Sequence, residues 1–267
     1  MLFRKEEKEM YCKDIINMIE QFYPVSYAMD WDNVGLLAGR ADQEVKKVYV
    51  TLDLTDESID DAIAQNADMI VTHHPLIFSP LHSVTDQDFI GRRILKLISH
   101  SISYYAMHTN YDVVRMADLA SEIMELHDVE VLEMCFPEEN KGIGKIGKID
   151  TPISLKECCG SVKQKFGLDH VKVFGNLETK VNKIAILPGS GKSAIDTAVE
   201  KNADVLITGD IGHHEGIDAV AKGLAIIDAG HYGIEHIFIE DMGNFLQTHL
   251  PQIKVVKDQI RHPFQIC

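Results

Sequence analysis

The sequence contains no apolar run approaching the ~20 residues that a helix needs to span a bilayer. Its first nine residues also lack the apolar core of a signal peptide. We therefore expect a cytoplasmic protein with no membrane partner. Basic residues are scarce, because 26 Lys and Arg stand against 41 Asp and Glu, for a formal net charge of −15. Nonspecific nucleic-acid binding needs basic surface that displaces counterions, so we expect no nucleic-acid partner either.

Cysteine occurs only five times, an odd number, and no two cysteines have the CxxC spacing of a zinc knuckle. The pattern argues against a disulfide framework and a structural zinc site, and we expect reduced thiols that fill space in the core. The neighbours Cys158 and Cys159 are interpreted as core residues of a helix rather than as nucleophiles. With 267 residues the chain can bury a full core, as one large domain or as two lobes.

An internal repeat is the most informative feature that the sequence does contain. Residues 59–72 (IDDAIAQNADMIVT) align without gaps with residues 195–208 (IDTAVEKNADVLIT), and seven of the fourteen positions are identical. Each copy ends its apolar run at a polar cluster, THHP at 72–75 and TGD at 208–210. A duplicated unit that presents two polar strand ends is a way to build one site from two halves.

Strands and helices alternate around both copies. Apolar runs predict buried strands at residues 48–52, 69–72, 102–106, 183–187, 205–208 and 224–228, and helical periodicity predicts helices through 15–22, 59–63 and 94–98. Thr55 or Asp56 is the expected cap of the helix in the first copy, and Ser190 or Ser193 that of its counterpart. This order predicts an α/β fold built twice.

We place the first lobe at residues 1–130 and the second at 131–267, with a C-terminal segment that is free to pack back on the first. The glycine-spaced residues 141–148 lie near the midpoint of the chain and are the expected hinge or hairpin between the halves.

The histidines point to a metal centre. Nine of the thirteen lie within residues 73–108 and 213–236, after the two copies of the repeat. In HTNYD at 108–112 and HYGIE at 231–235 a carboxylate follows a histidine by four residues, which on a helix places both side chains on one face. A loop at a strand end could do the same. The candidate ligands are His73, His74, Asp112, His231 and Glu235, with His108 close by.

Imidazole and carboxylate ligands without thiolates suit Zn, Mn, Fe, Co or Ni. Five ligands exceed what one catalytic zinc ion takes, and they suit two ions that share a bridging carboxylate. In a regular strand His73 and His74 would face opposite sides, so both reach one centre only where the strand ends. Pro75 supplies that break.

Three further features each have a structural and a functional interpretation. PGSGKS at 188–193 resembles a phosphate-binding P-loop, but the first glycine of GxxxxGK[ST] would have to stand at Ile186. A tight strand-to-helix turn is therefore favoured over an anion site at the helix start. Trp31, the only tryptophan, either stacks on a substrate ring or anchors the turn at 30–35, and the anchor is favoured. His213 and His214 are weaker candidates for a supporting or substrate-binding role.

Taken together, these motifs resemble the Nif-three-like dinuclear metal proteins, a family often named "GTP cyclohydrolase 1 type 2 homolog". The resemblance runs in order from about residue 11 to 265, and its motifs are WDNVGL at 31–36, THHP at 72–75, HTNYD at 108–112, GSG at 189–191, TGD at 208–210 and GHYGIE at 230–235.

The resemblance implies two similar α/β lobes related by internal pseudo-symmetry, with a two-metal site in the cleft between them. It also implies ring-shaped homohexamers. The family's ligands map onto the same five residues, with Glu235 as the bridging carboxylate. Some members carry an inserted third domain, for which this chain is too short. One departure is Ile234, where small or polar residues often stand, and we expect it to alter the pocket wall rather than the metals.

The leading functional hypothesis is a metal-dependent hydrolase, in which two divalent ions activate a water that attacks a small-molecule substrate. For the ring opening of GTP the water would attack C8 of the purine, with His108 or His214 moving protons. A phosphoester substrate would use the same water. The alternative is a non-enzymatic metal- or nucleotide-binding protein with a regulatory or metal-handling role. In a third, structural interpretation the metals only join the two lobes.

Overall fold

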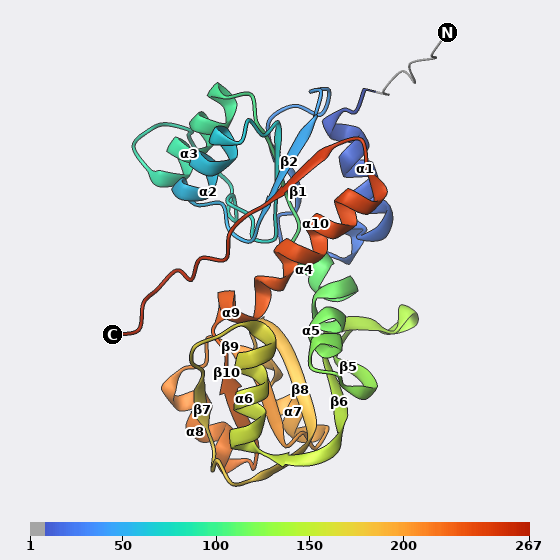
Figure 1. Cartoon of the computed structure of the whole chain (residues 1–267), viewed down its shortest axis with the longest axis vertical. Coiled ribbons are helices and arrows are strands. Elements are labelled where there is room, and N and C mark those ends of the chain that lie inside the picture. The colour runs from blue at the N-terminus through green and yellow to red at the C-terminus, as the bar shows by residue number, and fades with distance from the viewer. Residues whose placement is uncertain (1–8) are drawn as a thin grey trace. The chain divides into compact units, whose positions relative to one another are not determined.

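The computed structural model describes residues 9–267, and Figure 1 labels its helices and strands. Residues 1–8, most of the stretch expected to lack a signal-peptide core, lie outside the described part. The chain divides into two compact units, each made of two stretches of sequence. The first unit holds the described residues up to Tyr111 together with Phe238–Ile260, and the second holds Asp112–Ile237 and Arg261–Cys267.

The boundary therefore falls between Tyr111 and Asp112 and not between residues 130 and 131, where the sequence suggested it. The reason is strand pairing. The segment before residue 131 enters strand β5 (His127–Phe136), which pairs with β6 (Lys141–Ser154) of the second sheet. Paired strands share backbone hydrogen bonds, so they belong to one folded unit.

The first unit is built on a five-stranded sheet with the order β1-β4-β3-β2-β11. Strands β4, β3, β2 and β11 run parallel, and β1 is antiparallel to β4. The C-terminal strand β11 thus packs back on the first unit. The bounds are β1 (Gly35–Ala38), β2 (Lys47–Thr51), β3 (Met69–Thr72), β4 (Ser103–Ala106) and β11 (Lys254–Lys257).

Helices cover both faces of this sheet, which explains why its central strands β2, β3 and β4 are buried at nearly every position. Figure 1 shows α2 and α3 on one side of the sheet and α1 with α10 on the other. Thr55 caps α2 as expected, since its Oγ1 accepts a hydrogen bond from the Ser58 N–H at 3.1 Å. The bounds are α1 (Cys12–Phe22), η1 (Val25–Tyr27), α2 (Asp56–Ala64), α3 (Phe89–Ser99), α4 (Thr109–Tyr111) and α10 (Ile237–His249).

The second unit repeats this plan. Its six-stranded sheet has the order β5-β6-β8-β9-β10-β7, in which β8, β9 and β10 run parallel, like β2, β3 and β4. Strand β7 is antiparallel to β10, as β1 is to β4. The expected pair of similar α/β lobes is therefore confirmed. The remaining strands are β7 (Lys172–Phe174), β8 (Lys180–Ser190), β9 (Val205–Gly209) and β10 (Ala225–Asp228).

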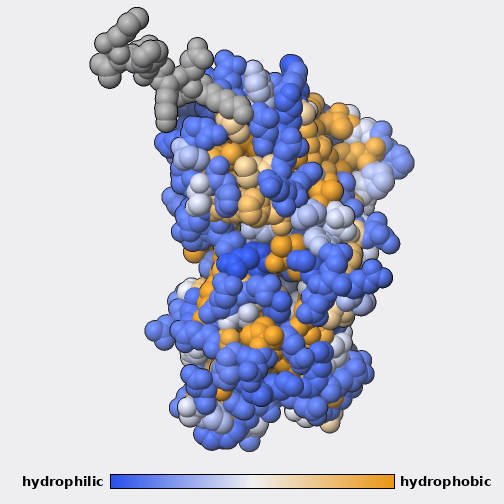
Figure 2. Space-filling model, turned by 90° about the vertical axis from the view of Figure 1, so that its right-hand side faces the viewer, coloured by the Kyte–Doolittle hydropathy of each residue, from blue (hydrophilic) through white to orange (hydrophobic). Residues whose placement is uncertain are grey.

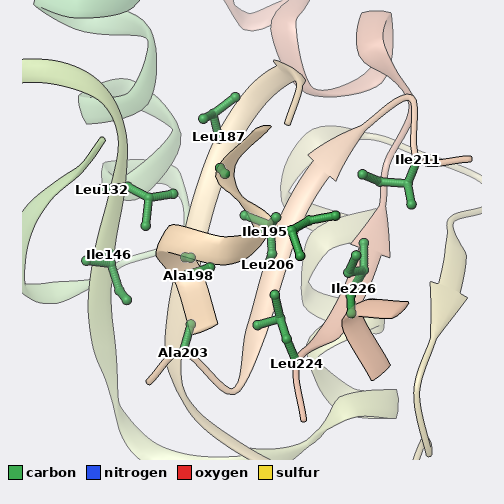
Figure 3. Packing of buried hydrophobic residues seen from close by; sticks show 13 residues of the cluster. Leu132, Ile146, Leu187, Ile195, Ala198, Ala203, Leu206, Ile211, Leu224 and Ile226 are labelled. Atoms are coloured by element: carbon green, nitrogen blue, oxygen red, sulfur yellow. The ribbon is translucent and has the colours of Figure 1, made fainter. Parts of the chain in front are cut away.

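Apolar side chains of α7 and the strands form the core of the second unit. Figure 3 shows Ile195 and Ala198 of α7 over Leu206 of β9. No side chain caps this helix: Gly191 precedes η4 and Ala194 precedes α7, so the capping role expected of Ser190 or Ser193 is wrong. The bounds are η2 (Asp112–Met116), α5 (Ala117–Ile123), η3 (Pro137–Glu139), α6 (Leu155–Phe166), η4 (Lys192–Ala194), α7 (Ile195–Glu200), α8 (His213–Ala221) and α9 (His231–Glu235).

The repeat extends to individual hydrogen bonds. Asn66 and Asn202, at matching positions, both have a left-handed backbone, with φ of 53° and 55°. Two residues later, Asp68 and Asp204 each accept two backbone N–H groups from the start of the preceding strand, at 2.8–2.9 Å. Three consecutive identical residues of the repeat, at 66–68 and 202–204, therefore turn the chain from helix to strand. Asparagine and aspartate are suited to this because they tolerate the left-handed region and bond to nearby backbone.

The glycine-spaced residues 141–148 lie inside β6, so their expected role as a hinge between the halves is wrong. The strand does form a hairpin with β5, but within the second unit. Close backbone approach explains the glycines: a Cβ on Gly142 would stand 2.0 Å from the carbonyl oxygen of Glu133.

The thiols are free, as predicted. Cys12, Cys158 and Cys159 are buried, and Cys267 is exposed. Burial raises the pKa of Cys158 to about 12, and the neighbouring thiol Cys159 adds to the effect. A thiol in this state is a core residue and not a nucleophile.

No helix within residues 9–267 combines the length and the apolar character that crossing a bilayer requires. On the face shown in Figure 2, hydrophilic residues predominate and separate the apolar patches from one another.

Candidate metal centre

In the first unit, three of the predicted residues gather where parallel strands end. His73 and His74 directly follow β3, and His108 stands two residues after β4. Because β3 and β4 are parallel neighbours, their carboxyl ends meet at one edge of the sheet. The ring centroids are 4.9 Å apart for His73 and His74, 5.4 Å for His73 and His108, and 5.7 Å for His74 and His108. Their nitrogens lie within 4.8 Å of one another, so this group can hold a metal ion.

Hydroxyl groups turn the chain immediately after β3. The carbonyl oxygen of His74 accepts hydrogen bonds from Thr72 Oγ1 at 2.8 Å and from the hydroxyl of Tyr104 at 3.0 Å. The same Tyr104 oxygen accepts the backbone N–H of Leu76 at 2.8 Å. The N–H of His74 still donates to the carbonyl of Leu52 at 3.0 Å, so backbone pairing with the chain after β2 stops only at the carbonyl of His74, directly before the proline that suggested a break.

Aspartates that the sequence analysis did not assign support two of these histidines. His74 Nδ1 lies 2.7 Å from Asp53 Oδ1, and His108 Nδ1 lies 2.8 Å from Asp32 Oδ1. An ionised carboxylate only accepts hydrogen bonds, so Nδ1 is the donor in both pairs. That bond leaves Nε2 as the nitrogen that faces a ligand, the arrangement typical of metal-binding histidines.

Asp32 is held ionised. Burial by itself would raise the pKa of its carboxyl group, but hydrogen bonds from His108 and from the hydroxyl of Thr109 outweigh burial and lower the pKa to about 2. The backbone N–H of Thr109 adds a further bond at 3.0 Å. The WDN motif thus has a physical role: its aspartate ties the turn at 30–35 to the segment that carries His108.

In the second unit, His231 and Glu235 stand at the two ends of α9, so the four-residue spacing does place them on one helix face. His231 Nε2 lies 3.0 Å from Glu235 Oε2, and His231 Nδ1 lies 2.7 Å from Asp210 Oδ2. Nδ1 donates its hydrogen to Asp210, so in a neutral ring Nε2 carries a lone pair. This lone pair would face the carboxylate of Glu235, and the two would repel each other. A proton shared between the two atoms or a metal ion bound by both would remove this repulsion.

Gly189 makes room for Glu235. Its backbone is left-handed (φ +80°), and a Cβ there would stand 2.5 Å from Glu235 Oε1. The segment that resembles a P-loop is accordingly the turn that the sequence favoured, and its glycine lets the carboxylate of the buried Glu235 lie against the backbone.

Asp112 begins a π-helical turn. It is the first residue of η2, which follows the short α4 without a break, and its side chain is half-buried. A π-helical turn inside a helix is rare and is often found at functional sites. His108, four residues earlier, stands between β4 and α4, so of the two arrangements that the spacing allowed, this pair has the loop at a strand end and not one regular α-helix.

His214 lies in the first turn of α8 and is exposed. Its ring stands 5.2 Å from that of the neighbouring His213. A catalytic role for His214 stays a prediction.

The comparison with known sequences decides the family. The profile of Duf34/NIF3 (NGG1p interacting factor 3) matches residues 10–263. The chain belongs to the Duf34/NIF3 family. The motifs found in the sequence are therefore motifs of this family, as the resemblance indicated.

Duf34/NIF3 relatives cover nearly the whole chain. A Lactococcus lactis subsp. lactis protein named "GTP cyclohydrolase 1 type 2 homolog" is 36% identical over 261 residues, which are 96% of this chain and 99% of that protein. A Clostridium acetobutylicum protein of the same name is 35% identical over 250 residues, 91% of this chain and 92% of that one. Among solved structures, a Bacillus cereus protein related to NIF3 superimposes with a TM-score of 0.92 at 26% identity, covering 97% of this chain and 100% of that one.

Proposed function

We propose that this Duf34/NIF3 protein is a metal-dependent hydrolase in which side chains of both units bind the same two divalent metal ions. One observation carries the proposal: three histidines each hold Nδ1 at 2.7–2.8 Å from an aspartate, which directs Nε2 toward a ligand. The donor set of imidazole nitrogens and carboxylate oxygens suits Zn, Fe, Mn, Ni or Co. The proposed ligands are His73, His74, Asp112, His231 and Glu235, with Glu235 shared between the ions.

Chain connectivity supports a site that uses both units. The chain passes from one unit to the other between Tyr111 and Asp112, and again between Ile237 and Phe238. Asp112 is the first residue beyond one passage, and Glu235 stands two residues before the other. Both carboxylates therefore stand close in sequence to a passage between the units.

The chemistry follows from the donor set. When bound, two divalent ions lower the pKa of a coordinated water and polarise the bond under attack. His108 is the proposed proton carrier of the first unit: Asp32 accepts the hydrogen bond from its Nδ1, so Nε2 is the atom that takes up or releases a proton. His214 is proposed to move protons from the second unit.

The proposed substrate is a small molecule, either a nucleotide opened at C8 of its purine or a phosphoester. The names of the Lactococcus and Clostridium relatives favour the purine.

The test of a shared centre is a double-mutant cycle between the units. His74→Ala and His231→Ala are made singly and together, and metal affinity is measured by competition with a chromophoric chelator. Ligands of the same ions lose affinity non-additively, whereas ligands of separate sites lose it additively. Additive losses would contradict the shared centre.

The test of hydrolysis uses protein loaded in turn with Mn, Fe, Co, Ni or Zn, with product formation measured from GTP and from generic phosphoesters. Glu235→Gln should abolish turnover and keep the fold, whereas Glu138→Gln, an exposed carboxylate in η3, should change neither. If no metal form turns over any substrate, the non-enzymatic binder is favoured. A sharp fall of the melting temperature on chelation, with no nucleotide binding, would favour metals that only join the units.

The homohexamer is proposed on the family resemblance alone. Light scattering coupled to size exclusion tests it, and a monomer at micromolar concentration would contradict it.

A further inference from the structure

Two large aromatic side chains of the first unit are exposed side by side. Trp31 is 60% exposed and Phe78 is 52% exposed, and their ring centroids lie 5.9 Å apart at an interplanar angle of 45°. Trp31 comes from the loop before β1 and Phe78 from the loop between β3 and α3. An indole exposed to this extent does not anchor its turn by burial, so the favoured interpretation of Trp31 is not supported.

The loops that carry the two rings are tied down although the rings are exposed. The side-chain amide of Asn33 donates a hydrogen bond to the carbonyl of Ile77, which joins the two loops directly. Asp32, next to Trp31, has a fully buried carboxylate that binds His108 Nδ1 and the backbone N–H of Thr109. The rings are thus presented by a fixed backbone, and little further ordering is needed when a ligand binds.

Both rings border the histidine cluster. Their centroids lie 6.0 Å (Trp31) and 6.3 Å (Phe78) from that of His108, with interplanar angles of 77° and 74°. A flat group that stacks on one of these rings, with the other ring tilted by 45° beside it, would therefore lie close to His108, the proposed proton carrier.

We propose that Trp31 and Phe78 bind the planar heteroaromatic ring of the substrate by stacking, beside His108. This proposal rests on the hydrolase proposed above, whose substrate class it specifies. Exposed aromatic surface is costly in water, and base–aromatic stacking contributes ~1–3 kcal/mol per base without requiring one particular base. The ring recognised is accordingly a nucleobase or a related heterocycle, and a substrate without such a ring does not use this surface.

The test uses the fluorescence of Trp31, which reports on this site alone because the chain has a single tryptophan. GTP, UTP and inorganic triphosphate are titrated into metal-free and metal-loaded protein. We expect saturable quenching by both nucleotides and weaker binding of triphosphate, which offers the same charge without a ring. Phe78→Ala should weaken nucleotide binding by about 5- to 150-fold, the equivalent of ~1–3 kcal/mol.

The matched control is Phe89→Ala. Phe89 is 52% exposed, like Phe78, but stands at the start of α3 with the guanidinium of Arg93 over its ring. Its removal should leave nucleotide binding unchanged, and Phe78→Leu tests whether an apolar side chain that is not aromatic suffices. Unfolding curves of each variant show whether the fold is kept.

Three outcomes overturn the stacking site. These are nucleotide binding no tighter than that of triphosphate, equal effects of Phe78→Ala and Phe89→Ala, and absence of quenching by both nucleotides. A change of Trp31 fluorescence on dilution without ligand would also overturn it, because a second copy of the chain would then cover the rings. Ring-dependent quenching without turnover by any metal form would instead refute the hydrolase and leave the stacking site standing.

Discussion

Gly189 offers the sharpest test of how the second unit positions its carboxylate. In Gly189→Ala the new Cβ would stand 2.5 Å from Glu235 Oε1 and 3.7 Å from His231 Nε2. Close carbon–oxygen contacts start at about 3.3 Å, so the carboxylate has to move by about 0.8 Å. Metal–ligand distances tolerate only about ±0.2 Å. Loss of a residue that supports a metal ligand lowers metal affinity ~10–100-fold. We expect displacement of the ligand itself to lower metal affinity by at least as much.

Backbone strain has to be separated from this effect, and Gly223 provides the control. It has a similar backbone (φ +89°), lies in the same unit, and a Cβ there meets nothing within 4 Å. An alanine in the left-handed region costs ~1–2 kcal/mol, so both variants should lose about that much free energy of unfolding as metal-free protein. Gly223→Ala should keep the metal affinity of the wild type.

Urea unfolding of the metal-free proteins measures the shared strain, and titration against a chromophoric chelator measures metal binding. If Gly189→Ala binds metal as tightly as Gly223→Ala does, the carboxylate of Glu235 is not a ligand or is not positioned by this turn.

Three further predictions follow from single contacts. Asp210→Asn removes the charge that holds His231 Nδ1 at 2.7 Å, so metal affinity should fall by ~10–100-fold, whereas a change below twofold by chelator competition would contradict this role. Because the pKa of Asp32 is lowered from 3.8 to about 2, the ionised group stabilises the fold above pH 3.8 and loses this effect as pH falls toward 2. Asp32→Asn should therefore lower the free energy of unfolding by about 2 kcal/mol at neutral pH, with a deficit that shrinks in acid, and a deficit independent of pH would refute the assignment. A thiol reagent near neutral pH should label the exposed Cys267 and leave Cys158 unmodified until the protein is unfolded, as peptide mapping can show.

Local features of the sequence were enough to predict several of the elements. Apolar runs located β2, β3, β9 and β10 to within a residue or two, and the cap of α2 was narrowed to Thr55 or Asp56, of which the structure has Thr55. The repeat predicted two similar lobes, because identical residues that turn a helix into a strand build the same unit twice. These inferences succeed because strand burial, helix caps and turns involve residues close together in the chain.

The sequence alone did not predict which residues far apart in the chain contact each other. Asp32 and His108 are 76 residues apart, and only the order of strands in the first sheet brings them to 2.8 Å. The boundary between the units depends in the same way on which sheet β5 joins. Pairing of this kind has no periodicity and no fixed spacing, so neither motif nor composition reveals it.

By itself, the sequence determined the class of fold, its duplication and the residue types of a candidate metal centre, since these follow from local patterns and from ligand chemistry. Only the tertiary structure decided which aspartates orient the histidines, why Gly189 faces Glu235, and that Trp31 is exposed beside Phe78. Those facts depend on where strand ends and loops meet in space, and the packing of whole sheets and helices sets these positions.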